Sequence, residues 1–246
     1  MANGKNMANR EVCNAIIKNY QTKKPLLYVD YANATTTEVT GESVYAYGGM
    51  GHPRRVTFNG EKGGTIAFEF QVQPFQLFAI MSGAEIEKTA SFYKRAEVVA
   101  KAGGVLDLPE EALGSVVNIY AENDDCGTDL GTSAVISGKE VTLEAAQEGK
   151  KYFVYYETKV TGDTVQKISI TGKTFPKALT IDADTIYKAE DDTVIPMRLR
   201  VYKCQPQSQF TLTHSNSGDP GTITLTCDLM EDENGNMIDM IAIEEE

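Results

Sequence analysis

The chain has 246 residues, of which 41% are hydrophobic, and it contains 12 Tyr, 9 Phe and no Trp. Its formal net charge of −12 excludes the broad basic surface with which nucleic-acid-binding proteins hold phosphates, and the lack of Trp removes a Trp platform for sugars. No apolar run reaches the roughly 20 residues that span a bilayer, and the N-terminus lacks the apolar core of a secretory signal. The four cysteines form no CxxC pair and fit no zinc spacing, so we expect an unexported protein with reduced thiols.

The first fifty residues predict a short helix followed by strands. Residues 10–20 are expected to form the helix. The stretch "KKPLLYVDYANATTTEVTGESVYAYGG" is rich in β-branched and aromatic residues, which favour extended structure. Residues 48–53, "GGMGHP", have the composition of a flexible loop.

Residues 54–83, "RRVTFNGEKGGTIAFEFQVQPFQLFAIMSG", carry the strongest local pattern in the chain. Its large apolar residues share one parity, which predicts a strand hairpin with one buried face: Val56, Phe58, Ile66, Phe68, Phe70 and Val72. Asn59-Gly60, helped by Gly63-Gly64, is expected to form the hairpin turn because these residues tolerate positive φ. Pro74 and Gly83 then bound a short apolar helix at 74–82, which must pack on a sheet to be stable.

The rest of the chain predicts further short strands. The segment 86–101 looks strand-like, and segment 103–160 is interpreted as an inserted β subdomain of Ig-like kind with four strands, at 105–108, 115–121, 139–144 and 151–160. Strands are expected to resume at 164–171, 178–188, 193–204, 208–214 and 222–229, with Cys227 as a small core residue. The expected fold is therefore mainly β, a β-sandwich or barrel with one or two flanking helices.

No segment predicts an active site, a metal or a cofactor. The two histidines, His52 and His214, are expected at the surface, and neither adjoins a cysteine in sequence. "TGKT" at 171–174 lacks the upstream glycine of a phosphate-binding loop, where Lys167 stands instead. The loop "ENDDCGTDLG", 122–131, lacks the later bidentate acid of a calcium loop. The acids at 182–192 could serve a glycosidase only at a separation that the sequence does not specify, and we expect that the protein is not an enzyme.

The order of these elements resembles the tail tube (major tail) proteins of long-tailed bacteriophages. The resemblance rests on "TGESVYAYGGMGHPRRVTFNGEKGGTIAFEFQVQPFQLFAIMSG" and on the closing segment "TFPKALTIDADTIYKAEDDTVIPMRLRVYKCQPQSQFTLTHSNSGDPGTITLTCDLMED". It covers most of the chain, which would then be a single tail-tube-like domain, 1–246, with 103–160 as its insertion.

The resemblance implies hexameric rings that stack into the tube through which DNA leaves the virion, without specific DNA binding and without a membrane. The other implied partners are a tape-measure protein, a baseplate hub, a tail terminator and, in some tails, a sheath, with assembly in the host cytoplasm. We expect the glycine-rich loop to reach the next ring through Tyr45, Tyr47, Gly48, Gly49, Arg54 and Arg55. The expected lumen-facing residues have the parity opposite to the apolar row: Thr57, Thr65, Glu69 and Gln71.

Charge is unevenly spread between the chain ends, which also suits attraction between copies. Residues 1–24 carry five Lys or Arg and one acid, whereas residues 228–246 carry eight acids and no base. Two solvated tails would explain the same pattern. The alternative to a tube protein is a monomeric Ig-like adhesion or decoration module of a virion surface, for which segment 103–160 alone would suffice.

Overall fold

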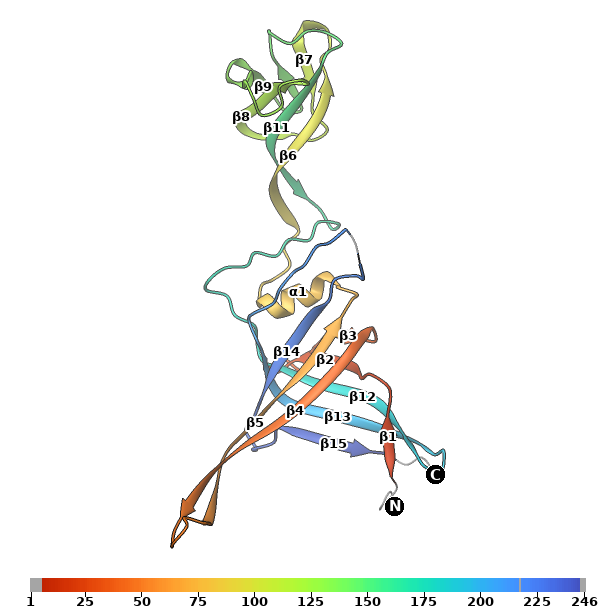
Figure 1. Ribbon diagram of the computed structural model, residues 1–246. Helices are drawn as coiled ribbons and strands as arrows, with labels where there is room; N and C mark the ends of the chain where they lie inside the picture. The colour runs from red at the N-terminus through yellow and green to blue at the C-terminus, as the bar shows by residue number, and fades with distance from the viewer. Residues whose placement is uncertain (1–5, 217, 244–246) are drawn as a thin grey trace. The chain divides into compact units, whose positions relative to one another are not determined.

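The computed structural model describes residues 6–216 and 218–243 and is mainly β, with one α-helix (Figure 1). The expected mainly β fold with a flanking helix is confirmed. Segment Ile86–Lys167 forms one compact unit, and the chain on either side of it forms the other. The first unit contains β1 (Met7–Asn9), β2 (Asn14–Asn19), β3 (Pro25–Val29), β4 (Ala32–Tyr47), β5 (Arg54–Phe70), α1 (Phe75–Ser82), β12 (Leu179–Ala189), β13 (Val194–Pro206), β14 (Ile223–Met230) and β15 (Ile238–Ala242).

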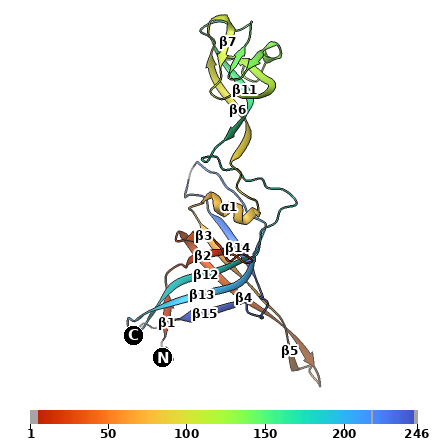
Figure 2. The same cartoon turned by 180° about the vertical axis from the view of Figure 1, so that it is seen from behind.

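The first unit is built on one antiparallel sheet in the order β3-β2-β12-β13-β14-β5-β4, with β1 added to β12 and β15 added to β13. The long strand β13 pairs with β15 along Met197–Val201 and then with β14 along Lys203–Pro206. The sheet therefore folds over, so that β4, β5 and β14 lie across β12, β13 and β15 (Figures 1 and 2).

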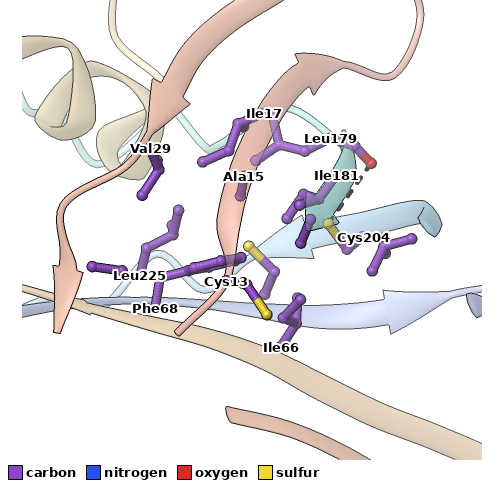
Figure 3. Packing of buried hydrophobic residues seen from close by; sticks show 14 of the residues in the cluster. Cys13, Ala15, Ile17, Val29, Ile66, Phe68, Leu179, Ile181, Cys204 and Leu225 are labelled. Atoms are coloured by element: carbon purple, nitrogen blue, oxygen red, sulfur yellow. Dashed lines mark hydrogen bonds between the residues drawn. The ribbon is translucent and has the colours of Figure 1, made fainter. Parts of the chain in front are cut away.

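The core of this unit lies between those two layers (Figure 3). It is made of alternate residues of each strand, as period two requires. Fully buried side chains come from both layers: Ile17, Phe68, Ile181, Val201 and Leu225. Cys227 is buried here as expected, and Cys204 and Cys13 are buried as well.

Helix α1 confirms the helix expected at 74–82. It follows Pro74 and ends at Gly83, which has φ 71°. Gly83 is required twice, because its φ is left-handed and because a Cβ there would lie 2.1 Å from the carbonyl oxygen of Phe175. Leu77, Ile80 and Met81 are buried, so the helix packs its apolar side into the core.

The helix expected at residues 10–20 is wrong. Residues Asn14–Asn19 form strand β2, which pairs with β12 on one edge and β3 on the other. Ala15 and Ile17 are buried whereas Asn14 and Ile16 are exposed, so the segment has period two. Pairing on both edges satisfies its backbone, and this tertiary contribution outweighs a weak local helix preference.

The hairpin exists, but its turn is not at Asn59-Gly60. Strands β4 and β5 pair with each other almost throughout, and the turn lies at residues 48–53. The register moves from Gly41–Lys62 to Ser43–Asn59, so β5 carries one extra residue there. The extra residue lies at Gly60-Glu61, opposite Glu42, so Gly60 takes part in a β-bulge rather than a turn. Glycine suits both roles.

The second unit consists of two three-stranded antiparallel sheets with a separate core. One sheet has the order β6-β11-β8 and the other β7-β10-β9. The second unit begins before residue 103, where the sequence placed the start of the insertion, because β6 pairs with β11 along its whole length. Its strands are β6 (Thr89–Val99), β7 (Val105–Asp107), β8 (Ala112–Ala121), β9 (Val135–Ser137), β10 (Glu140–Thr142) and β11 (Lys151–Thr161), with short 3-10 turns at Ala102–Gly104 and Gly131–Ser133.

Two segments predicted as strands lie in loops. Segment 164–171 contains one isolated bridge, between Lys167 and Glu87. Segment 208–214 belongs to the loop between β13 and β14, in which Phe210 packs against the core. Both segments have a composition that favours strands, but composition does not show whether a partner strand is available. In the structure no neighbouring strand pairs with either segment along its length.

Candidate assembly surfaces

The distal halves of β4 and β5 form an arm, defined here as residues 42–60, that continues past the other strands of its sheet (Figure 1). Register pairs Val44 with Phe58 and Ala46 with Val56, which places these four side chains on one face, called the apolar arm face. Val44, Val56 and Phe58 are 63%, 50% and 58% exposed. An apolar patch of this kind, without a core beneath it, is typical of an interaction surface.

Phe58 was expected in the core, and this prediction is wrong. The bulge adds one residue between Phe58 and Ile66, so their equal parity no longer means the same face. The bulge also separates Thr57 from Thr65 and Glu69, because Thr57 pairs with Tyr45 on the face opposite to the apolar arm face.

The tip of the arm brings the predicted inter-ring residues together. The backbone N–H of Gly48 donates to the Pro53 carbonyl at 3.3 Å, and the N–H of His52 donates to the Gly49 carbonyl at 3.2 Å. Arg55 Nε donates to the Gly48 carbonyl at 3.3 Å. The guanidinium of Arg54, which pairs in register with Tyr47, lies 4.1 Å from the centroid of the Tyr45 ring. The tip is thus a folded, cationic turn, while its contact with another ring stays a prediction.

The root of the arm carries a second surface, the polar sheet face, on the side of β4, β5 and β14 that points away from the core. Register places three residues of each strand there: Ala34, Thr36, Glu38, Thr65, Ala67, Glu69, Thr224, Thr226 and Asp228. These nine positions hold three acids and no Lys or Arg. Among the predicted lumen residues, Thr65 and Glu69 lie on this face, and Gln71 is exposed just after β5.

Sequence reasoning missed the contributions of β4 and β14 to the polar sheet face. The alternation of Thr224, Thr226 and Asp228 with buried Ile223 and Leu225 was a usable signal. It did not reveal that β14 lies beside β5, since strand order is set by long-range pairing.

Four strands of the first unit pair with only one neighbour within residues 6–216 and 218–243, and each therefore has an open edge. Strands β3 and β4 stand at the two ends of the sheet order, and β1 and β15 are the short additions to β12 and β13. The open edge of β4 runs along 16 residues, whereas edge strands of monomeric proteins are usually short or protected. Open edges can accept strands from another copy of the chain.

Two acids of the 182–192 cluster are held in ion pairs within the first unit. Burial alone would raise the pKa of Asp182, but bonds from Lys18 and Arg200 outweigh it and lower that pKa. Asp184 pairs with Arg198 at 2.5 Å. In the described chain no group of three or more His, Cys, Asp or Glu is placed to hold a metal ion. His52 lies in the arm turn and His214 in the exposed β13–β14 loop.

Asp129 of the "ENDDCGTDLG" loop is part of the second unit's scaffold. Burial would raise the pKa of its carboxyl, but three hydrogen bonds lower that pKa below its ordinary value. The donors are Asn118 Nδ2 at 2.7 Å, the Gly131 N–H at 2.8 Å and the Ile119 N–H at 2.9 Å. The loop is thus a hydrogen-bonded polar turn.

The charges at the chain ends are partly used within the first unit. Lys18 pairs with Asp182, Asp228 accepts from Gln207 at 2.9 Å, and Asp239 accepts from the Tyr202 hydroxyl at 2.5 Å. Lys5 and Glu244–Glu246, which belong to the predicted attraction between copies, lie outside the described residues.

The chain is similar along nearly its whole length to a known family. Residues 10–243 match the model of the YomU/Tube protein family, a family of phage tail tube proteins. No curated protein matches the sequence. No helix in the described parts of the chain is long and apolar enough to cross a membrane. Tail tube proteins are structural components of the virion tail that assemble with their own copies into a tube. The chain therefore belongs to the YomU/Tube protein family, and the tail tube resemblance seen in its sequence is confirmed.

Proposed function

We propose that six copies of this chain form a ring and that the rings stack head to tail into the tail tube, the conduit for genome delivery. The observation that carries the proposal is the β4–β5 arm, whose exposed apolar face has no counterpart in the core of its own molecule. A two-stranded hairpin without further support is marginal in water, so the arm is stabilised by contacts made in the assembly. Six-fold symmetry comes from the family resemblance.

Neighbouring copies in a ring join through their open strand edges. The free edges of β3 and β4 offer backbone N–H and C=O groups along two sides of the same sheet. Pairing of one copy's edge with another's would satisfy those groups and continue the sheet around the ring.

The polar sheet face lines the channel. Glu38, Glu69 and Asp228 would recur around every ring and present negative charge to the DNA. Basic side chains in the same place would bind phosphates through counterion release and retain the genome. A small, threonine-rich and acidic wall lets DNA slide without specific binding.

The remaining roles follow from tube assembly. The tape-measure protein, the baseplate hub and the tail terminator are the proposed partners at the lumen and the two tube ends, a sheath is a further proposed partner in contractile tails, and assembly takes place in the host cytoplasm. The whole chain acts as a single tail-tube-like domain in which the second unit is an insertion.

Electron microscopy of the purified, intact protein tests the proposal. We expect six-fold rings or tubes with an open channel, at high protein concentration or after addition of a nucleating tail-tip complex. A particle that stays monomeric in both conditions and across a range of salt concentrations overturns it.

A further inference from the structure

The second unit carries aromatic side chains on the outer face of its β6-β11-β8 sheet, a surface called the aromatic sheet face. The core lies on the other face, where Val154 and Tyr156 are fully buried. Four of the eight residues on the aromatic sheet face are aromatic, whereas none of the nine residues of the polar sheet face is. Register places the eight in three neighbouring rows: Tyr93 and Glu157; Arg95, Tyr155 and Asn118; Glu97, Phe153 and Tyr120.

The Tyr93 side chain lies across the sheet instead of standing away from it. Its hydroxyl donates to Asn118 Oδ1 at 3.3 Å, and the two residues belong to β6 and β8, the outer strands of the sheet. These strands are about 9.6 Å apart because β11 lies between them, so Tyr93 reaches Asn118 only by crossing β11. Tyr93 is nevertheless 59% exposed. It therefore presents ring surface to solvent in a fixed orientation.

Arg95, two residues further along β6, is a second planar group that is held in place. Its guanidinium lies 3.8 Å from the centroid of the Phe153 ring. Arg95 Nη2 donates to Asp125 at 2.8 Å, and Nε donates to the Tyr155 hydroxyl at 3.0 Å. Groups that are already ordered lose little conformational entropy when a ligand binds.

We propose that the aromatic sheet face binds a neutral cell-surface polysaccharide. The negative π face of an aromatic ring attracts the C–H groups on the apolar face of a sugar ring, so Tyr93 can stack on one sugar unit. Glu157 and Arg95, in the same and the next row, can exchange hydrogen bonds with its hydroxyls. The source is a cell surface because the chain belongs to a family of virion tail components.

Charge separates this ligand from two other classes. Segment Ile86–Lys167 carries 14 acids against nine bases, a net charge of −5, which repels nucleic acids and anionic glycans. Each of the three rows also holds a charged residue, whereas the centre of a protein interface is depleted of charge. The inference does not rest on the proposed function, because one subunit carries the whole face.

Affinity electrophoresis of the unassembled subunit tests the proposal. The net charge of −12 carries the protein into native gels, which contain dextran, galactomannan, a soluble β-glucan or heparin. We expect at least one neutral polysaccharide to retard the wild type and heparin not to. Tyr93→Ala should abolish the retardation. Tyr28→Ala should preserve it, because Tyr28 is equally exposed, at 57%, but lies on β3 of the first unit.

Neither substitution alters the charge, and circular dichroism should show that both variants fold. A wild type that no neutral polysaccharide retards overturns the proposed site. Retardation that Tyr93→Ala keeps, that Tyr28→Ala loses, or that heparin also causes overturns it as well. These outcomes leave the proposed tube standing, which electron microscopy tests separately.

Discussion

Replacing Phe68 with alanine should remove a large part of the folding free energy of the first unit. Phe68 is fully buried near the inner end of β5, stacks on Phe70 with ring centroids 6.3 Å apart, and pairs in register with Leu225 of β14 (Figure 3). Loss of a buried Phe costs about 3–5 kcal/mol through lost transfer free energy and the cavity left behind. Domains are typically stable by about 5–15 kcal/mol, so a unit at the low end of that range would be left close to unfolding.

Phe58→Ala is the matched control, because it makes the same chemical change on the same strand at an exposed position. It should change the free energy of unfolding by less than about 0.5 kcal/mol. Hydrogen exchange in increasing guanidinium, followed in peptides of β14 and β11, would report the two units separately. We expect Phe68→Ala to lower protection in β14 and leave β11 unchanged. A cost below about 1 kcal/mol for Phe68→Ala, or an equal cost for Phe58→Ala, would refute the assignment of faces.

Three further predictions concern the charged residues. Reversing Arg54 and Arg55 to Glu should leave the subunit folded but prevent stacking, and normal tubes in micrographs of the double variant would contradict this role. Glu69→Lys should permit tubes but slow DNA release, measured as the ejection rate of virions carrying the variant; an unchanged rate would argue against a lumenal Glu69. Asp129→Ala should cost the second unit about 1–3 kcal/mol through its unsatisfied donors. Because the folded-state pKa of Asp129 is lowered, its contribution is complete above the ordinary value of 3.8 and fades as pH falls through the lowered value, so wild type and variant should converge in acid unfolding.

The sequence predicted the elements whose causes are local. The two ends of α1 were predictable from Pro74 and Gly83, because the backbone conformation at a helix end depends on single residues. Ile66, Phe68 and Phe70 were placed in the core because they alternate without interruption. The helix prediction for residues 10–20 failed because the local sequence does not show that β2 pairs with β3 and, far along the chain, with β12. That pairing makes the segment a strand.

The face of a strand on which each side chain lies was harder to predict than the strand itself. Asn59-Gly60 suits both a turn and a bulge, since both need a backbone free of side-chain restraint. The choice between them depends on whether β4 offers a partner beyond Gly41, and it does, as far as Tyr47. One extra residue then inverts every face assignment on the distal side, as for Phe58 and Thr57. The polar sheet face, to which β4, β5 and β14 all contribute, depends on strand pairing that is equally long-range in sequence.

The failed prediction for Phe58 supports the assembly role that we propose for the arm. Alternation of apolar residues shows that a strand face meets something apolar, but not that the partner belongs to the same molecule. For Phe68 the partner is the core of its own unit, whereas Phe58, Val56 and Val44 alternate equally well and remain half exposed. Burying about half of three large side chains adds a favourable contribution of roughly 1 kcal/mol each, so one docked arm contributes a few kcal/mol. In the proposed ring this contact would recur once per copy, and contacts of that size can form reversibly while their sum favours the assembled tube.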